Sequence, residues 1–100
     1  MMIKLNLNIP FVDLDGKQIG KETLGVDLAK TLVGGSKGEA LKFYDWAVAL
    51  HKGQEISVDN ADIKKISEFI EQDTNMTVLL KAQLLKAIDE CAKKAKDGVK

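Results

Sequence analysis

The sequence contains no arginine: all 15 of its basic residues are lysines, and they balance 15 acidic residues. Arginine supplies the planar fork that binds phosphate and guanine through two hydrogen bonds, whereas lysine offers only a point charge. A chain without net charge also produces no overall field that would attract nucleic acid or an anionic membrane. The composition therefore counts against base-specific DNA recognition. An alternative explanation for the absence of arginine is an AT-rich coding genome, which favours lysine codons.

Cysteine, histidine and long apolar runs are scarce as well. The chain has one cysteine, Cys91, and one histidine, His51. A single cysteine cannot form an internal disulfide, so nothing indicates secretion. No apolar run approaches the roughly 20 residues of a membrane-spanning helix, and Met1–Asn6 lacks the apolar stretch of a signal peptide. We therefore expect a cytoplasmic protein with no membrane partner.

The apolar fraction of 45% in 100 residues is typical of one folded domain, which we predict to span residues 1–100. Residues 3–9 alternate between apolar and polar side chains, and this period of two predicts a half-buried strand. Asp15 and Gly16 then stand between apolar runs, a pattern that predicts a β-hairpin with a type I′ turn.

Helical spacing of apolar residues follows the hairpin and predicts an α+β fold that is mostly α, with the N-terminal hairpin or small sheet packed on about four helices. Ser36 and Glu39 match a capping box before the second helix, and Gly53 is placed to end it. Asp59 is suited to cap the third helix. After the fourth helix, residues 93–100 predict a frayed basic tail. The four helices are expected near residues 24–33, 36–52, 59–72 and 77–92.

The second of these helices is apolar nearly all round, which is typical of a helix in a core or at an interface. Tyrosine and tryptophan dominate the hot spots of protein interfaces, so Tyr44 and Trp46 are our candidate partner-binding residues, with Phe43 assigned to the core. The alternative is that the whole helix belongs to the core. Its first apolar face holds Ala40, Phe43, Ala47 and Leu50, widened by Trp46, and its second holds Leu41, Tyr44 and Val48.

One segment partly matches a calcium-binding EF-hand loop. Asp13-Leu14-Asp15-Gly16 and Glu22 stand at the spacing of several ligand positions. The first ligand position, however, falls on Phe11, which has no side-chain oxygen, and a strand replaces the entering helix. We therefore interpret the segment as a plain hairpin turn and expect no metal site.

Catalytic and cofactor motifs are also incomplete. Residues 34–38 open a helix with glycines, but their Ser-Lys-Gly order differs from the Gly-Lys-Ser/Thr of a phosphate-binding loop. His51 and Cys91 lie forty residues apart without a metal-ligand or nucleophile spacing. We expect no catalytic residues, no cofactor and no enzyme activity.

The order of segments resembles that of small proteins encoded by bacteriophages and prophages. The resemblance implies a phage origin, a location in the host cytoplasm, and a role such as tail-assembly chaperone, other morphogenesis factor, inhibitor of a host protein or regulator. It assigns no functional residue. The segments that carry it are Asp13-Leu14-Asp15-Gly16, Thr23-Leu24-Gly25, Ser36-Lys37-Gly38, the run from Lys42 to Ala47, Ile56-Ser57-Val58-Asp59, Thr77-Val78-Leu79 and the run from Lys81 to Leu85.

These observations predict a non-catalytic protein-protein interaction or assembly factor that binds another protein or a second copy of itself. Adjoining acidic (51–75) and basic (76–100) segments would suit self-association. One alternative is a small nucleic-acid-binding regulator that uses Lys93, Lys94 and Lys96, together with Lys100. Another is a phage inhibitor of a host protein.

Overall fold

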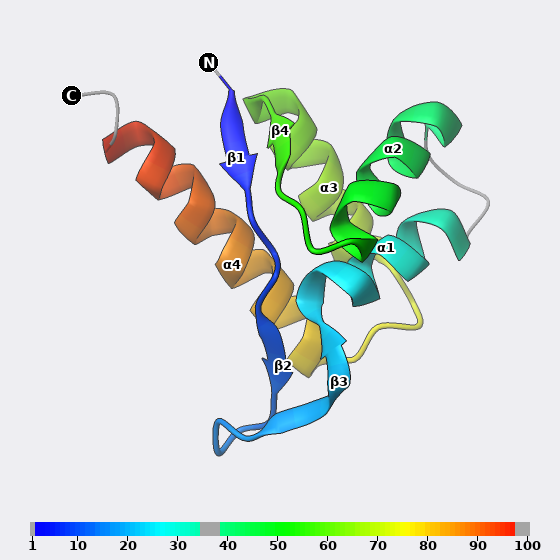
Figure 1. Cartoon of the computed structure of the whole chain (residues 1–100), viewed down its shortest axis with the longest axis vertical. Coiled ribbons are helices and arrows are strands. Elements are labelled where there is room, and N and C mark those ends of the chain that lie inside the picture. Colours follow the sequence, from blue (N-terminus) through cyan, green and yellow to red (C-terminus); the bar gives the residue numbers. More distant parts are fainter. Residues whose placement is uncertain (1, 35–38, 98–100) are drawn as a thin grey trace. The chain divides into compact units, whose positions relative to one another are not determined.

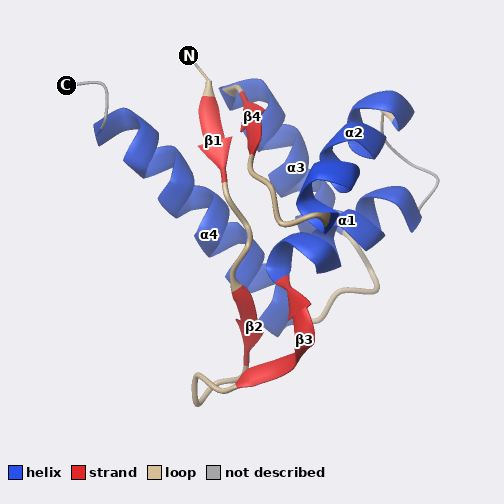
Figure 2. Ribbon diagram, viewed as in Figure 1, coloured by secondary structure: helices blue, strands red, loops and turns tan. Residues whose placement is uncertain are grey.

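The computed structural model describes residues 2–34 and 39–97. Within these ranges the protein is α+β and mostly α, as predicted, with small two-stranded sheets rather than one continuous sheet (Figures 1 and 2). β1 pairs with β4, and β2 pairs antiparallel with β3. The elements are β1 (Ile3–Leu5), β2 (Pro10–Val12), β3 (Gln18–Thr23), α1 (Leu24–Gly34), α2 (Ala40–His51), β4 (Ile56–Val58), α3 (Asn60–Gln72) and α4 (Val78–Asp97).

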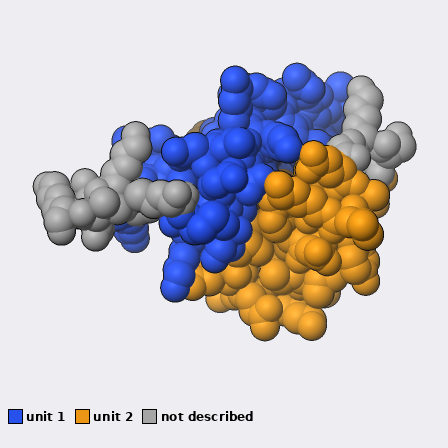
Figure 3. Space-filling view, turned by 90° about the horizontal axis from the view of Figure 1, so that it is seen from above, with its two compact units in different colours: residues 1–5, 57–100 blue, residues 6–56 orange. Residues whose placement is uncertain are grey.

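The chain divides into two compact units, coloured separately in Figure 3. Unit 1 holds residues 1–5 and 57–100, and unit 2 holds residues 6–56. Unit 1 therefore contains β1, α3 and α4, whereas unit 2 contains the β2–β3 hairpin, α1 and α2. That the two form one cooperative domain stays a prediction.

Unit 1 is held together by apolar stripes on its helices and its strand. β1 packs on α4, and α3 packs on α4. Ile66 and Ile70 of α3, four residues apart, are fully buried, and so is Leu84 of α4. Burying a leucine or isoleucine side chain contributes about 1.5–3 kcal/mol relative to leaving it exposed.

α3 begins where the sequence predicts. The side chain of Asp59 accepts a hydrogen bond from the amide of Asp62 at 2.7 Å, and the Asp62 side chain accepts one from the Asp59 amide at 3.2 Å. This reciprocal capping box satisfies two of the amides that have no partner in the first turn of a helix. It also explains why Asp62, only 6% exposed, is tolerated as a buried acid.

The end of α4 differs from the predicted tail. α4 continues to Asp97, so residues 93–97 are helical, and residues 98–100 lie outside the described residues. Lysine and alanine both favour the helix. Lys93 also pairs with Asp89 one turn earlier, with its Nζ 3.0 Å from Oδ2. The loss of apolar spacing in this segment therefore does not end the helix.

In unit 2, α1 packs on α2. Leu24, Leu28 and Leu32 form the buried stripe of α1, as their spacing predicts. α2 ends as predicted: Gly53 has a φ of 79° and its amide donates to the Leu50 carbonyl at 3.1 Å. Glycine adopts this left-handed conformation without steric cost, which is why it terminates helices.

The start of α2 lies beside a stretch that the structure leaves undescribed. α2 begins at Ala40 with Glu39 at the N-cap, and the Glu39 side chain makes no capping hydrogen bond. The predicted capping box needs Ser36, which lies outside the described residues, as do Gly35, Lys37 and Gly38.

The predicted strand over residues 3–9 is shorter than expected. β1 ends at Leu5, and the carbonyls of Leu7 and Ile9 accept hydrogen bonds from the amides of Gly25 and Leu24, both at 2.8 Å. The first amides of α1 need partners from outside the helix, and these carbonyls supply them. The alternation of apolar and polar residues does not reveal these hydrogen bonds to α1. It also wrongly predicts that Ile9 is buried, whereas Ile9 is 41% exposed.

The β2–β3 hairpin is confirmed, but its turn type is not the predicted one. A type I′ turn needs positive φ at both central residues. Only Gly16 in the turn has positive φ, at 85°, and its amide donates to the Asp13 carbonyl at 3.0 Å. Leu14 and Asp15 are therefore the central residues of a type I turn, and Gly16 follows in the left-handed conformation, the usual form of a longer hairpin loop.

Candidate functional site

α2 has two apolar faces, and the structure separates them by burial. The first face is in the core: Phe43 is 6% exposed and Trp46 is 7% exposed. Their rings stack with centroids 5.7 Å apart and an interplanar angle of 26°. The Nζ of Lys42 lies 5.5 Å from the centre of the Trp46 ring, within the range of a cation–π interaction. Phe43 is thus confirmed as a core residue.

The second face of α2 is at the surface. Leu41 is 83% exposed, Tyr44 is 59% exposed and Val48 is 37% exposed. Spacings of three and four residues place them in one row along the helix. We call these three residues the α2 stripe.

The structure therefore separates the two candidate partner-binding residues. Tyr44 lies in the α2 stripe and is exposed. Trp46 packs in the core, so its ring cannot reach a partner without repacking the helix. The helical spacing already grouped Trp46 with Phe43 and Leu50, and it grouped Tyr44 with Leu41 and Val48. What the aromatic content of the segment missed is the aliphatic part of the stripe, Leu41 and Val48.

An exposed tyrosine between two aliphatic side chains is chemically suited to binding protein. The tyrosine ring buries a large apolar area, and its hydroxyl retains a hydrogen bond at the edge of a contact. Asp45 on α2 and Lys52, the residue that follows the helix, are both exposed and carry opposite charges. The stripe thus offers apolar contact without a field that selects one sign of charge.

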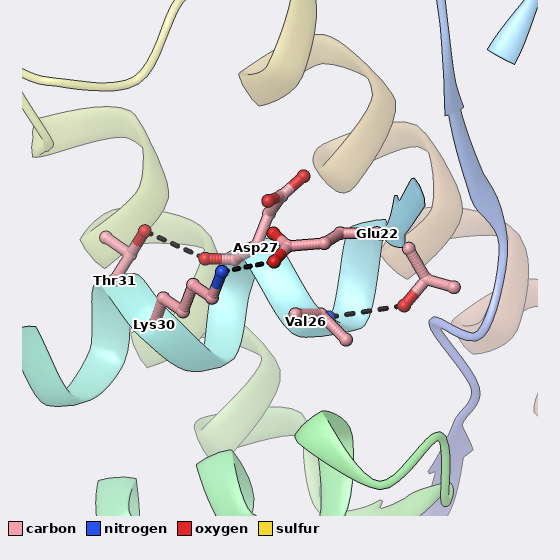
Figure 4. A network of polar contacts seen from close by, with 6 residues as sticks. Glu22, Val26, Asp27, Lys30 and Thr31 are labelled. Carbon is pink, nitrogen blue, oxygen red and sulfur yellow. Dashed lines mark hydrogen bonds and ion pairs between the residues drawn. The ribbon is translucent and has the colours of Figure 1, made fainter. Parts of the chain in front are cut away.

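A second group of polar side chains joins β3 to α1 (Figure 4). The Nζ of Lys30 contacts Oε1 of Glu22, and both side chains are about half exposed. Thr23 caps α1 through its hydroxyl, which accepts from the Val26 amide at 3.3 Å. The Thr31 hydroxyl donates to the Asp27 carbonyl at 3.0 Å. This group anchors the first turns of α1 to the end of β3.

The two acids of the group have pKa values shifted in opposite directions. The hydrogen bond from Lys30 lowers the pKa of Glu22 below its ordinary value. Partial burial raises the pKa of Asp27, and the neighbouring Glu22 carboxyl raises it further. A pair of carboxyls with separated pKa values is one component of acid–base catalysis. Here, however, Lys30 forms an ion pair with Glu22, and both Glu22 and Asp27 lie near the N-terminal end of α1.

The partial EF-hand match does not gather its acids around a common point. Asp13 Oδ1 accepts hydrogen bonds from the amides of Asp15 and Lys17 at 2.9 and 3.0 Å, which stiffens the turn. Glu22 is engaged by Lys30 instead. Among the described residues, no group of three or more histidine, cysteine, aspartate or glutamate side chains could hold a metal ion.

The remaining candidates, His51 and Cys91, belong to different units. His51 is exposed at the C-terminal end of α2, and Cys91 is half-buried on α4 in unit 1. Of the predicted glycine loop only Gly34 is described, as the last residue of α1. A further exposed apolar residue, which was not among the candidate site residues, is Leu14 at the hairpin tip, 93% exposed.

No helix in the described ranges combines the length and the hydropathy needed to cross a membrane. Comparison of the chain with protein-family models, with curated proteins and with solved structures finds no match in any of the three.

Proposed function

We propose that this chain is a non-catalytic interaction or assembly factor and that the α2 stripe is its contact surface. The observation that carries the proposal is the exposure of Leu41, Tyr44 and Val48 in one row on a helix whose other face is in the core. Contiguous exposed apolar surface on a small protein often marks an interaction site. Tyr44 at the centre of the row is the expected hot spot.

The order of sequence segments supports a phage or prophage origin for this factor. Within that origin, an assembly role and the inhibition of a host protein both require a protein surface, so they differ in the identity of the partner and not in the stripe. A regulator that binds nucleic acid through the C-terminal lysines (Lys93, Lys94, Lys96 and Lys100) would instead show gel-shift binding at low salt that weakens steeply as salt rises.

Site-specific photocrosslinking tests the proposal. A benzoylphenylalanine at position 44 is expected to crosslink to a protein partner, or to a second copy of the chain, in the source cell. The same group at Lys64, an exposed residue of α3, is the matched control and is expected to give no such product. Serine at Leu41 or Val48, combined with the crosslinker at position 44, is expected to reduce the yield.

Two outcomes would overturn this assignment. One is equal crosslinking from positions 44 and 64, which would show that partners do not bind the α2 stripe in preference to other exposed surface. The other is capture of the same partners by the wild-type chain and by a Tyr44→Ser variant whose circular dichroism is unchanged. Light scattering at two concentrations separates self-association from binding to another protein.

A further inference from the structure

We draw no further inference here: the strongest candidate, the exposed α2 stripe of Leu41, Tyr44 and Val48, is the surface already used in the proposed function, and nothing in the structure shows what covers it.

Discussion

At Gly25 the backbone of α1 lies so close to two carbonyl groups that a side chain would make unusually tight contacts with them. A Cβ atom there would lie 3.1 Å from the Leu7 oxygen and 3.4 Å from the Leu50 oxygen. Both are backbone atoms and cannot rotate away. We expect Gly25→Ala to lower the free energy of unfolding by about 1–3 kcal/mol, the usual cost of overpacking, as measured by urea denaturation.

Gly34 is the matched control for Gly25. It is the last residue of the same helix, and a Cβ atom there meets nothing within 4 Å. Because alanine favours the helix over glycine, Gly34→Ala should leave the stability unchanged or raise it by up to about 1 kcal/mol. Equal losses in the two variants would contradict the close approach at Gly25.

Asp27 should make the protein less stable as the pH rises. Its pKa is raised in the folded state by partial burial, so the folded protein holds this proton more tightly than the unfolded chain does. The resulting contribution of Asp27 to the free energy of unfolding is fully present below the pKa of the unfolded state and is lost as the pH rises through the pKa of the folded state. Measured by urea denaturation from about pH 3 to pH 7, Asp27→Asn should gain stability relative to wild type, by less than about 1 kcal/mol because solvent screens the site.

Glu22 gives the opposite sign and serves as the comparison. Its pKa is lowered by the Lys30 hydrogen bond, so its contribution is present above the unfolded pKa and is lost as the pH falls through the folded value. Glu22→Gln should therefore lose stability relative to wild type as the pH rises over the same range. Parallel pH profiles for the two variants would contradict the separated pKa values.

Among the elements, α3 has the most clearly defined beginning. Asp59→Ala removes the acceptor for the Asp62 amide, which is one of the two hydrogen bonds of the capping box, and keeps the backbone amide that donates to the Asp62 carboxyl. We expect a loss of about 0.5–2 kcal/mol in the free energy of unfolding. Asp59→Ser keeps an acceptor at the same place and should recover most of the loss. If serine and alanine cost the same, the capping hydrogen bond does not stabilise the helix.

The elements that the sequence predicts well are those whose signals are local. Leu24, Leu28 and Leu32 define α1 by spacing, and Asp59 and Gly53 mark where helices begin and end. The errors lie where distant backbone groups compete. The strand predicted through Ile9 stops early because the carbonyls of Leu7 and Ile9 accept hydrogen bonds from the first turn of α1. The local sequence pattern does not indicate these long-range hydrogen bonds.

The candidate site was likewise predicted well where local spacing decides and poorly where packing against other elements decides. The spacing of α2 residues is enough to assign Phe43 and Trp46 to one face of the helix and Tyr44 to the other. Which face is exposed depends on what packs against α2, and periodicity alone does not supply this. Aromatic content therefore selected both Tyr44 and Trp46, while burial retains Tyr44 and adds Leu41 and Val48.

At the scale of the whole molecule, the prediction of one domain concerns how the two units unfold. Each unit holds about half of the chain, and a unit of roughly 50 residues buries too little surface to be more than marginally stable alone. We therefore expect the two units to unfold together, as small single domains usually do.

Trp46, the only tryptophan, lies in unit 2, so its fluorescence follows the unfolding of that unit. Far-UV circular dichroism also follows α3 and α4 of unit 1. In urea, the two signals should give the same midpoint and the same slope. A variant that combines Trp46→Phe with Phe69→Trp moves the fluorescent probe to α3, and its fluorescence and circular dichroism should again coincide. Two separate midpoints in either protein would show that residues 6–56 and the remainder of the chain are independent domains.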